Sequence, residues 1–188
     1  MLSLKQSLLS SFLLTAFFTL PASAADIAAG ELKSGSCVGC HGQKGISGNA
    51  QWPSLAAQQP AYLVNQLKAF KSGNRSNTMM QAIATNLSNE DMDNLAAYFS
   101  SQKPARAISD PTLAKSGEAS ASMCLGCHGL SAEGKGQLPR LAGQHPGYLE
   151  QQLNNFKGGL RKSGPMQAIT ANLSETDIKA LAAYFGAR

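Results

Sequence analysis

The cysteines of this 188-residue chain all lie in two copies of one pentapeptide, Cys-x-x-Cys-His. The copies comprise Cys37, Cys40 and His41 in the first half of the chain, and Cys124, Cys127 and His128 in the second. Two thiols at this spacing can each add across a haem vinyl group, and the adjacent imidazole can then bind the iron from one side. The motif is the attachment signature of c-type haem, so the sequence predicts two covalently bound haem c groups.

The Cys-x-x-Cys pair also serves zinc sites, thioredoxin-like redox centres and disulfides. Zinc needs four ligands, whereas each copy supplies three and the only other histidine is His145. A redox pair needs no following histidine, and a disulfide framework would scatter its cysteines along the chain. Haem attachment is the interpretation that uses every residue of the repeated motif.

The first 24 residues have the composition of an export signal. Lys5 supplies a positive start, residues 8–20 are mostly apolar, and Ala22-Ser23-Ala24 is a small-residue cleavage site. The apolar run is short and interrupted by Ser and Thr, which disfavours a transmembrane helix. We therefore expect cleavage after Ala24 and a periplasmic protein. A retained anchor is the alternative, and peripheral association with the membrane stays open.

The charge of the mature chain is small. Removing Lys5 from the 16 basic residues leaves 15 against 11 acidic ones, a formal charge of +4. No run of basic residues with interleaved aromatic residues is present, so nucleic acid is not indicated as a partner. An ordinary solvated surface explains this excess better than a strongly dipolar docking face.

The chain repeats itself, which predicts two domains. Gly30 and Gly117 each stand seven residues before a first haem cysteine, at an offset of 87. Beyond the haem motifs the offset becomes 86, and every Tyr and Phe of the mature chain belongs to a pair at that offset. We expect one domain at 25–103, a linker at 104–111 and a second domain at 112–188.

Hydrophobic periodicity predicts helices in both halves, and no stretch alternates with period two for long enough to form a sheet. Ser88 with Asp91, and Ser174 with Asp177, resemble capping boxes that open the last helix of each half. A unit of about 80 residues is short of apolar core, and a large flat haem would supply the missing interior. The sequence therefore predicts an all-α protein with each unit wrapped around one haem.

Each iron needs a second axial ligand, and methionine is the candidate that repeats. Met80 lies 39 residues after His41, and Met166 lies 38 residues after His128. A thioether suits haem iron and raises its reduction potential relative to harder donors. Met79 is the alternative at the first site, although the register of the repeat favours Met80.

Two further positions bear on the ligands. His145 is matched by Gln59 in the first half, so a symmetrical bis-histidine arrangement is excluded. Pro53 and Pro139 follow the haem histidines by 12 and 11 residues, where their carbonyls could accept the ring N–H of the ligating imidazole. With both axial positions filled by protein, neither iron has an open site for substrate, which favours electron transfer over catalysis.

Two class I cytochrome c units in tandem, each with an early Cys-x-x-Cys-His and a methionine 39 or 38 residues later, resemble the di-haem cytochrome c4 family. The likeness covers essentially the whole mature chain. It includes Gly-Gln-His-Pro-Gly-Tyr at 143–148 and Leu-Ala-Ala-Tyr-Phe at 95–99 and 181–185. One departure is Thr78-Met79, which stands where the second half has Gly164-Pro165.

The resemblance implies an all-α fold of two tandem cytochrome c-like domains, related by an approximate two-fold axis and each wrapped around one covalently attached haem. It implies haem propionates that face each other across the interface, and His and Met axial ligands. It also implies a periplasmic electron carrier, not an enzyme, that delivers electrons at high potential to terminal oxidases or other respiratory acceptors. Its partners would then be redox proteins.

Two alternatives from other functional classes stay open. The same tandem architecture serves as the haem subunit of flavocytochrome sulfide dehydrogenases, and a copurifying flavoprotein would indicate that role. A di-haem peroxidase is the other alternative, and it would require an iron without a strong sixth ligand.

Overall fold

The computed structural model describes residues 24–188, so the predicted signal peptide lies outside the described residues except for Ala24. The first half contains α1 (Ile27–Lys33), α2 (Gly35–His41), the 3₁₀ turn η1 (Gln43–Gly45), α3 (Pro60–Lys71), α4 (Thr78–Thr85) and α5 (Asn89–Ser100). The second half contains α6 (Pro111–His128), α7 (Pro146–Lys157), α8 (Gly164–Thr170) and α9 (Glu175–Gly186). The all-α prediction is confirmed for the described residues.

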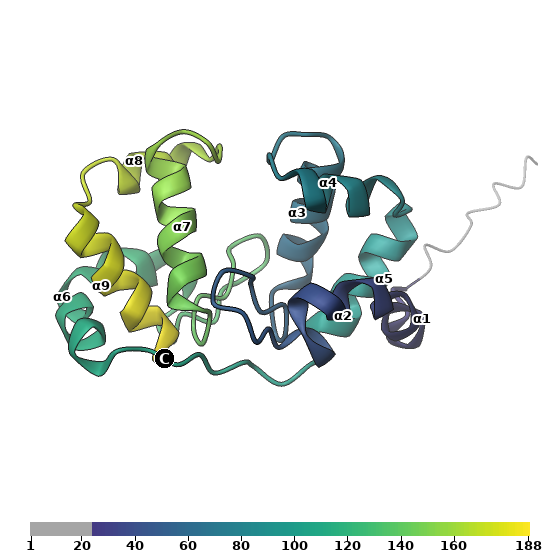
Figure 1. The fold of residues 1–188 in the computed structure, drawn as a ribbon, viewed down its shortest axis with the longest axis horizontal. Helices are drawn as coiled ribbons and strands as arrows, with labels where there is room; N and C mark the ends of the chain where they lie inside the picture. Colours follow the sequence, from purple (N-terminus) through teal and green to yellow (C-terminus); the bar gives the residue numbers. More distant parts are fainter. Residues whose placement is uncertain (1–23) are drawn as a thin grey trace, which may run out of the picture.

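The two halves form two helical lobes that lie side by side, joined by an extended segment along the lower edge of the view (Figure 1). This segment runs from the end of α5 to the start of α6 and is packed against the second lobe. Ala105 is buried, and the Ser109 hydroxyl donates a hydrogen bond of 2.6 Å to the carbonyl of Ala183. Within residues 24–188, no helix combines the length and apolar character that crossing a bilayer requires.

Local sequence explains where the last helix of each half begins. The Ser88 and Ser174 side chains accept hydrogen bonds from the N–H groups of Asp91 and Asp177, whose carboxylates accept from the serine N–H groups in return. Both predicted capping boxes are therefore confirmed. Lys33 of α1 also forms a 3.0 Å ion pair with Asp91. The Ser88 N–H and then the Lys33 ammonium lower the pKa of the Asp91 carboxyl.

The helix that carries the haem motif differs between the halves. In the second half it is continuous, because α6 runs from Pro111 to His128. In the first half it is divided at Ser34 into α1 and α2. Both haem histidines are nevertheless the last residues of their helices. The glycines that follow, Gly42 and Gly129, have φ values of +74° and +88°, a conformation that L-residues rarely adopt.

In each lobe the first helix crosses the last at a glycine. α1 packs on α5, and α6 packs on α9. A methyl group on Gly30 would overlap the carbonyl oxygen of Asn94, and one on Gly117 would overlap that of Ala180. The two glycines that mark the repeat therefore bring two helix backbones into direct contact.

Replacing Gly30 with alanine is expected to lower the free energy of unfolding by roughly 1 to 3 kcal/mol, because the added methyl forces two packed backbones apart. Gly35→Ala is the matched control, since a Cβ there meets nothing within 4 Å and alanine favours helix. Thermal unfolding of both variants measures the effect. Equal stabilities would contradict the close crossing.

The two cores repeat the same packing. The first contains Leu63, Leu87, Met92, Leu95, Ala96, Tyr98 and Phe99, with Cys37 packed against it. The second contains Leu149, Leu173, Ile178, Leu181, Ala182, Tyr184 and Phe185, among others, with Cys124 packed against it. The adjacent rings lie 5.2 Å apart in the first pair and 5.1 Å in the second. These four aromatics are core residues, and each small core has a haem cysteine packed against it.

Candidate haem sites

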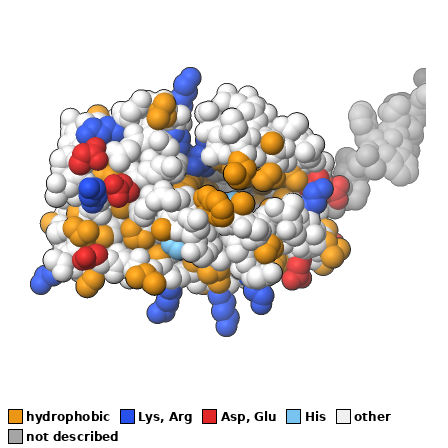
Figure 2. Space-filling view, in the orientation of Figure 1, with side chains coloured by type: hydrophobic (Ala, Val, Ile, Leu, Met, Phe, Trp, Pro, Cys, Tyr) orange, Lys and Arg blue, Asp and Glu red, His pale blue; other side chains and the backbone are white. Residues whose placement is uncertain are grey.

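One cavity of about 1210 Å³ extends into both lobes. It is lined by every residue that the sequence singled out for haem attachment or iron ligation: Cys37, Cys40, His41, Met79, Met80, Cys124, Cys127, His128 and Met166. Hydrophobic side chains border a hollow on the face shown in Figure 2. The structure therefore brings the predicted site residues of each half to one connected space.

The two haem histidines are buried and held in one orientation. The Nδ1 atom of His41 lies 2.8 Å from the carbonyl oxygen of Pro53, and that of His128 lies 2.8 Å from the carbonyl oxygen of Pro139. A carbonyl only accepts, so Nδ1 carries the proton and the Nε2 lone pair is left for a metal. The predicted proline carbonyl contacts are confirmed.

Burial lowers the pKa of His41, and the hydrogen bond to Pro53 opposes this only in part. The neutral imidazole is the form that binds iron, so this shift favours ligation. Burial also raises the pKa of the Cys37 and Cys124 thiols. Cys37, Cys40, Cys124 and Cys127 are all free of disulfide bonds.

The methionines come from a second pair of matched helices. Met80 and Met166 are each the third residue of their helix, α4 and α8. The helix register is fixed in the first lobe by the Asn77 side chain, which accepts a 2.9 Å hydrogen bond from the Met80 N–H. Met79 also lines the cavity, but 55% of its surface is exposed. Met80 is the residue whose position matches Met166.

Matched lysines hold the segments that follow these helices. The Lys71 ammonium donates a 2.5 Å hydrogen bond to the carbonyl of Leu87, and Lys157 donates one of 2.5 Å to Leu173. Each bond ties the chain beyond the methionine helix to α3 or α7. In Figure 1, α4 and α8 lie at the top of their lobes, whereas α2 and α6 lie lower. The histidine and the methionine that line the cavity in each lobe are thus carried by different helices.

His145 has a role outside the haem sites. Its Nε2 lies 2.8 Å from the carbonyl oxygen of Ser47 in the other lobe. Gln59, its counterpart in the repeat, donates from Nε2 to the carbonyl of Glu133 at 2.9 Å. These two residues make equivalent contacts between the lobes although their side chains differ.

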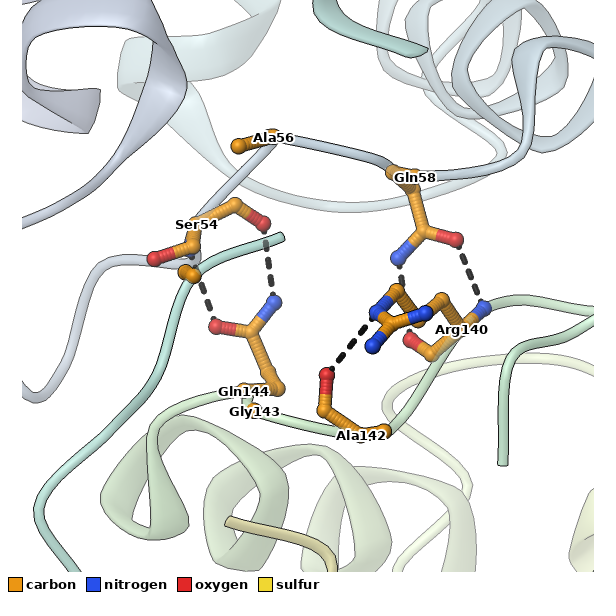
Figure 3. A pocket seen from close by; sticks show the side chains of 8 residues that line it. Ser54, Ala56, Gln58, Arg140, Ala142, Gly143 and Gln144 are labelled. Atoms are coloured by element: carbon orange, nitrogen blue, oxygen red, sulfur yellow. Dashed lines mark hydrogen bonds between the residues drawn. The ribbon is translucent and has the colours of Figure 1, made fainter. Parts of the chain in front are cut away.

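Two glutamines that sequence reasoning missed hold the lobes together. The Gln58 amide accepts from the Arg140 N–H at 2.7 Å and donates to its carbonyl at 3.0 Å. The Gln144 amide likewise accepts from the Ser54 N–H and donates to the Ser54 carbonyl, at 2.9 Å for each bond (Figure 3). Gln58 and Gln144 are both buried. Because each binds the main chain of the other lobe at an equivalent position, the interface has approximate two-fold symmetry.

The residues fit a c-type haem in each lobe. Each motif offers two free thiols and a histidine. Because the Nδ1 atom of each histidine donates its proton to a proline carbonyl, the Nε2 atom is left to bind iron. A soft thioether from α4 or α8 lines the same space, together with apolar side chains such as Leu95, Phe99 and Leu181. This donor set matches the axial ligands of electron-transfer haems.

Known proteins share this organisation. The sequence model of the cytochrome c family matches the chain twice, at residues 28–103 and 114–186. The chain is 39% identical to cytochrome c4 of Pseudomonas aeruginosa, over 94% of this chain and 96% of that protein. It is 33% identical to a thiosulfate dehydrogenase electron acceptor of Thiomonas intermedia, over 92% of this chain and 86% of that protein.

The fold agrees with these sequence relationships. The crystal structure of reduced recombinant cytochrome c4 from Pseudomonas stutzeri superposes with a TM-score of 0.80 at 35% identity, covering 87% of this chain and 99% of that one. The tandem family match, the full-length relatives and the shared fold place this chain in the cytochrome c family and, within it, among the di-haem cytochromes c4, which carry two covalently bound haem c groups.

Proposed function

We propose that each iron is held between one histidine and one methionine of its own lobe. The ligands are His41 and Met80 in the first lobe, and His128 and Met166 in the second. The thioether bonds come from Cys37 and Cys40, and from Cys124 and Cys127. The domains are 25–103 and 112–188, with a linker at 104–111. The observation that carries the proposal is the matched placement of an oriented histidine and a methionine around one cavity in both lobes.

Haem c, when bound, supplies a one-electron couple between ferrous and ferric iron. The protein's own residues would hold ferrous and ferric iron with the same ligands, so that little rearrangement accompanies electron transfer. The proline carbonyls fix the planes of the histidine rings, and the methionines give each iron a soft ligand that favours the reduced state. Apolar residues of the lining, such as Leu95, Phe99 and Leu181, would cover part of the haem and raise the potential further. With His41 and Met80, or His128 and Met166, holding the iron, the site would leave no position on the metal for a substrate, and the chain would act as an electron carrier.

The chain acts, in this proposal, as a periplasmic carrier that receives electrons from a respiratory donor and passes them to a terminal oxidase or another respiratory acceptor. Export after cleavage at Ala24 gives that location. A second candidate role is the acceptor of electrons from a thiosulfate dehydrogenase. It is favoured by the similarity to the Thiomonas intermedia protein described by that role. Reconstituted electron transfer with each partner distinguishes the two.

Carbon monoxide tests the carrier role against the peroxidase alternative. We expect the ferrous protein to bind no carbon monoxide within minutes at neutral pH, because both axial positions are occupied by side chains. Optical spectra before and after addition measure this. The Met166→Ala variant is the positive control, since it opens one of the two sites. Rapid binding by the unmodified protein, or turnover of hydrogen peroxide, would contradict the proposal.

A further inference from the structure

The two helices that carry the proposed methionine ligands are short. α4 has eight residues and α8 has seven, whereas isolated helices of fewer than about 12 residues are marginally stable in water. Each must therefore be held by contacts with the rest of its lobe. α4 packs on α3, and α8 packs on α7. A thioether from such a helix stays at the iron only while these contacts hold the helix in place.

A lysine at the end of each supporting helix makes one of these contacts. Lys71 is the last residue of α3, and Lys157 is the last residue of α7. Their ammonium groups donate the 2.5 Å hydrogen bonds to the carbonyls of Leu87 and Leu173, 16 residues further along the chain in both lobes. A hydrogen bond from a charged donor is roughly twice as strong as a neutral one. The same strong bond is thus made at the same place in both lobes.

The bonded carbonyls belong to the segments that leave the methionine helices. Leu87 stands two residues after the end of α4, and Leu173 stands three residues after the end of α8. Both leucines are buried, belong to the core of their lobe and line the cavity. The Leu87 N–H donates to the carbonyl of Ala84, and the Leu173 N–H donates to that of Thr170. A shift of either segment therefore passes directly into the last turn of the methionine helix.

The start of the methionine helix is anchored differently in the two lobes. In the first lobe the Asn77 side chain accepts a hydrogen bond from the N–H of Met80 itself. In the second lobe, within the described residues, the Ser163 side chain does not cap α8. The Ser163 N–H instead donates to the side chain of Gln167, inside the same helix, at 3.2 Å. The position of α8 therefore depends more on the lysine contact at its other end.

We infer that Lys71 and Lys157 are positioning residues for the axial methionines. Each ammonium holds the segment that leaves the methionine helix and thereby keeps the thioether at the iron. This inference rests on the proposed ligation by Met80 and Met166, and it adds the residue of each lobe that maintains the ligand. Loss of a lysine leaves the methionine in the chain but lowers the fraction of molecules in which it is bound. An external ligand then competes for the iron more easily.

The test is a titration of the oxidised protein with imidazole, followed by the weak near-red band that sulfur-ligated ferric haem gives. Lys71→Leu is measured in the Met166→Ala background, where only Met80 contributes to the band. Lys157→Leu is measured in the Met80→Ala background, where only Met166 contributes. We expect the apparent Kd of imidazole to fall roughly tenfold in the second lobe and roughly threefold in the first, where Asn77 keeps its bond to Met80.

Two exposed lysines outside the cavity supply matched controls. Lys68→Leu removes an ammonium one turn before Lys71 on the same helix, and Lys179→Leu removes one from α9. Lys71→Arg and Lys157→Arg keep a charged donor and should restore most of the resistance to imidazole. Thermal unfolding, measured in parallel by circular dichroism, separates positioning from stability. A merely structural role would lower the unfolding temperature and leave the imidazole affinity of the folded protein unchanged.

Imidazole affinities equal to those of the two control variants would overturn the inference and leave the proposed ligands intact, because the band itself would still be present. Arginine variants as sensitive to imidazole as the leucine variants would also overturn it, since the charged donor would then not be the cause. Absence of the band from the unmodified protein would instead refute methionine ligation, and this inference with it. If a leucine variant does not retain two haems per chain, Lys71→Gln or Lys157→Gln is titrated in its place and judged by the same comparisons.

Discussion

Replacing Met166 with alanine is expected to lower the potential of the second haem by a few tenths of a volt, within the roughly 0.8 V range that axial ligands span. The reason is that a thioether stabilises ferrous iron, and no other methionine of α8 or its loops can take its place. The potential of the first haem should change far less. Potentiometric titration followed by absorbance separates the two haems.

The weak near-red band of oxidised, sulfur-ligated haem should fall to about half in the same variant. In the first lobe, Met80→Ala should remove the other half, whereas the neighbouring Met79→Ala should leave the band intact. Because the two first-lobe variants differ by one position on α4, comparing them shows whether Met79 or Met80 is the ligand. Loss of the band in Met79→Ala but not in Met80→Ala would reverse the ligand assignment. An unchanged band in Met166→Ala would refute methionine ligation of the second haem.

Replacing Cys37 and Cys40 together with alanine is expected to leave one covalent haem per chain where the unmodified protein has two. The first core is a small cluster that includes Leu95 and Phe99, with Cys37 packed against it, so loss of the haem should also remove much of the interior of this lobe. We therefore expect the helices of the first lobe to unfold at a lower temperature than those of the second. Haem analysis and circular dichroism measure both effects.

The corresponding Cys124→Ala, Cys127→Ala variant is the matched partner, because it should empty the second lobe and spare the first. Each variant is thus the control for the other. Retention of two haems in either variant would contradict the assignment of one haem to each motif. Loss of both haems from one variant would instead mean that the lobes do not bind haem independently.

The parts of this protein that sequence predicts well are those set by local pattern. The two capping boxes and the all-helical fold follow from residues within a few positions of each other. The contacts from His41 to Pro53 and from His128 to Pro139 were predicted from spacing alone, because the repeat places a proline carbonyl at nearly the same distance from each histidine. The break between α1 and α2 was not predicted, since no proline marks Ser34.

The parts that were missed depend on contacts between distant segments. Gln58 and Gln144 are polar and look like surface residues in sequence, yet each is buried because it pairs with a main chain 82 or 90 residues away. Arg75 and Arg161 likewise read as ordinary surface charges, yet each guanidinium donates to a tyrosine and a glutamine of the other lobe. The available signal was their repetition at the offset of 86, shared with the tyrosines and glutamines that they contact. Repetition of polar residues, not only of apolar ones, marks a symmetrical interface.

One haem in each lobe, closed on both sides by protein, can be tested by measuring covalent haem per chain, by mass and by haem absorbance, together with the near-red band of the oxidised protein. We predict two haems per chain and a band intensity that corresponds to two sulfur-ligated irons. A ratio near one, or two haems without the band, would contradict it.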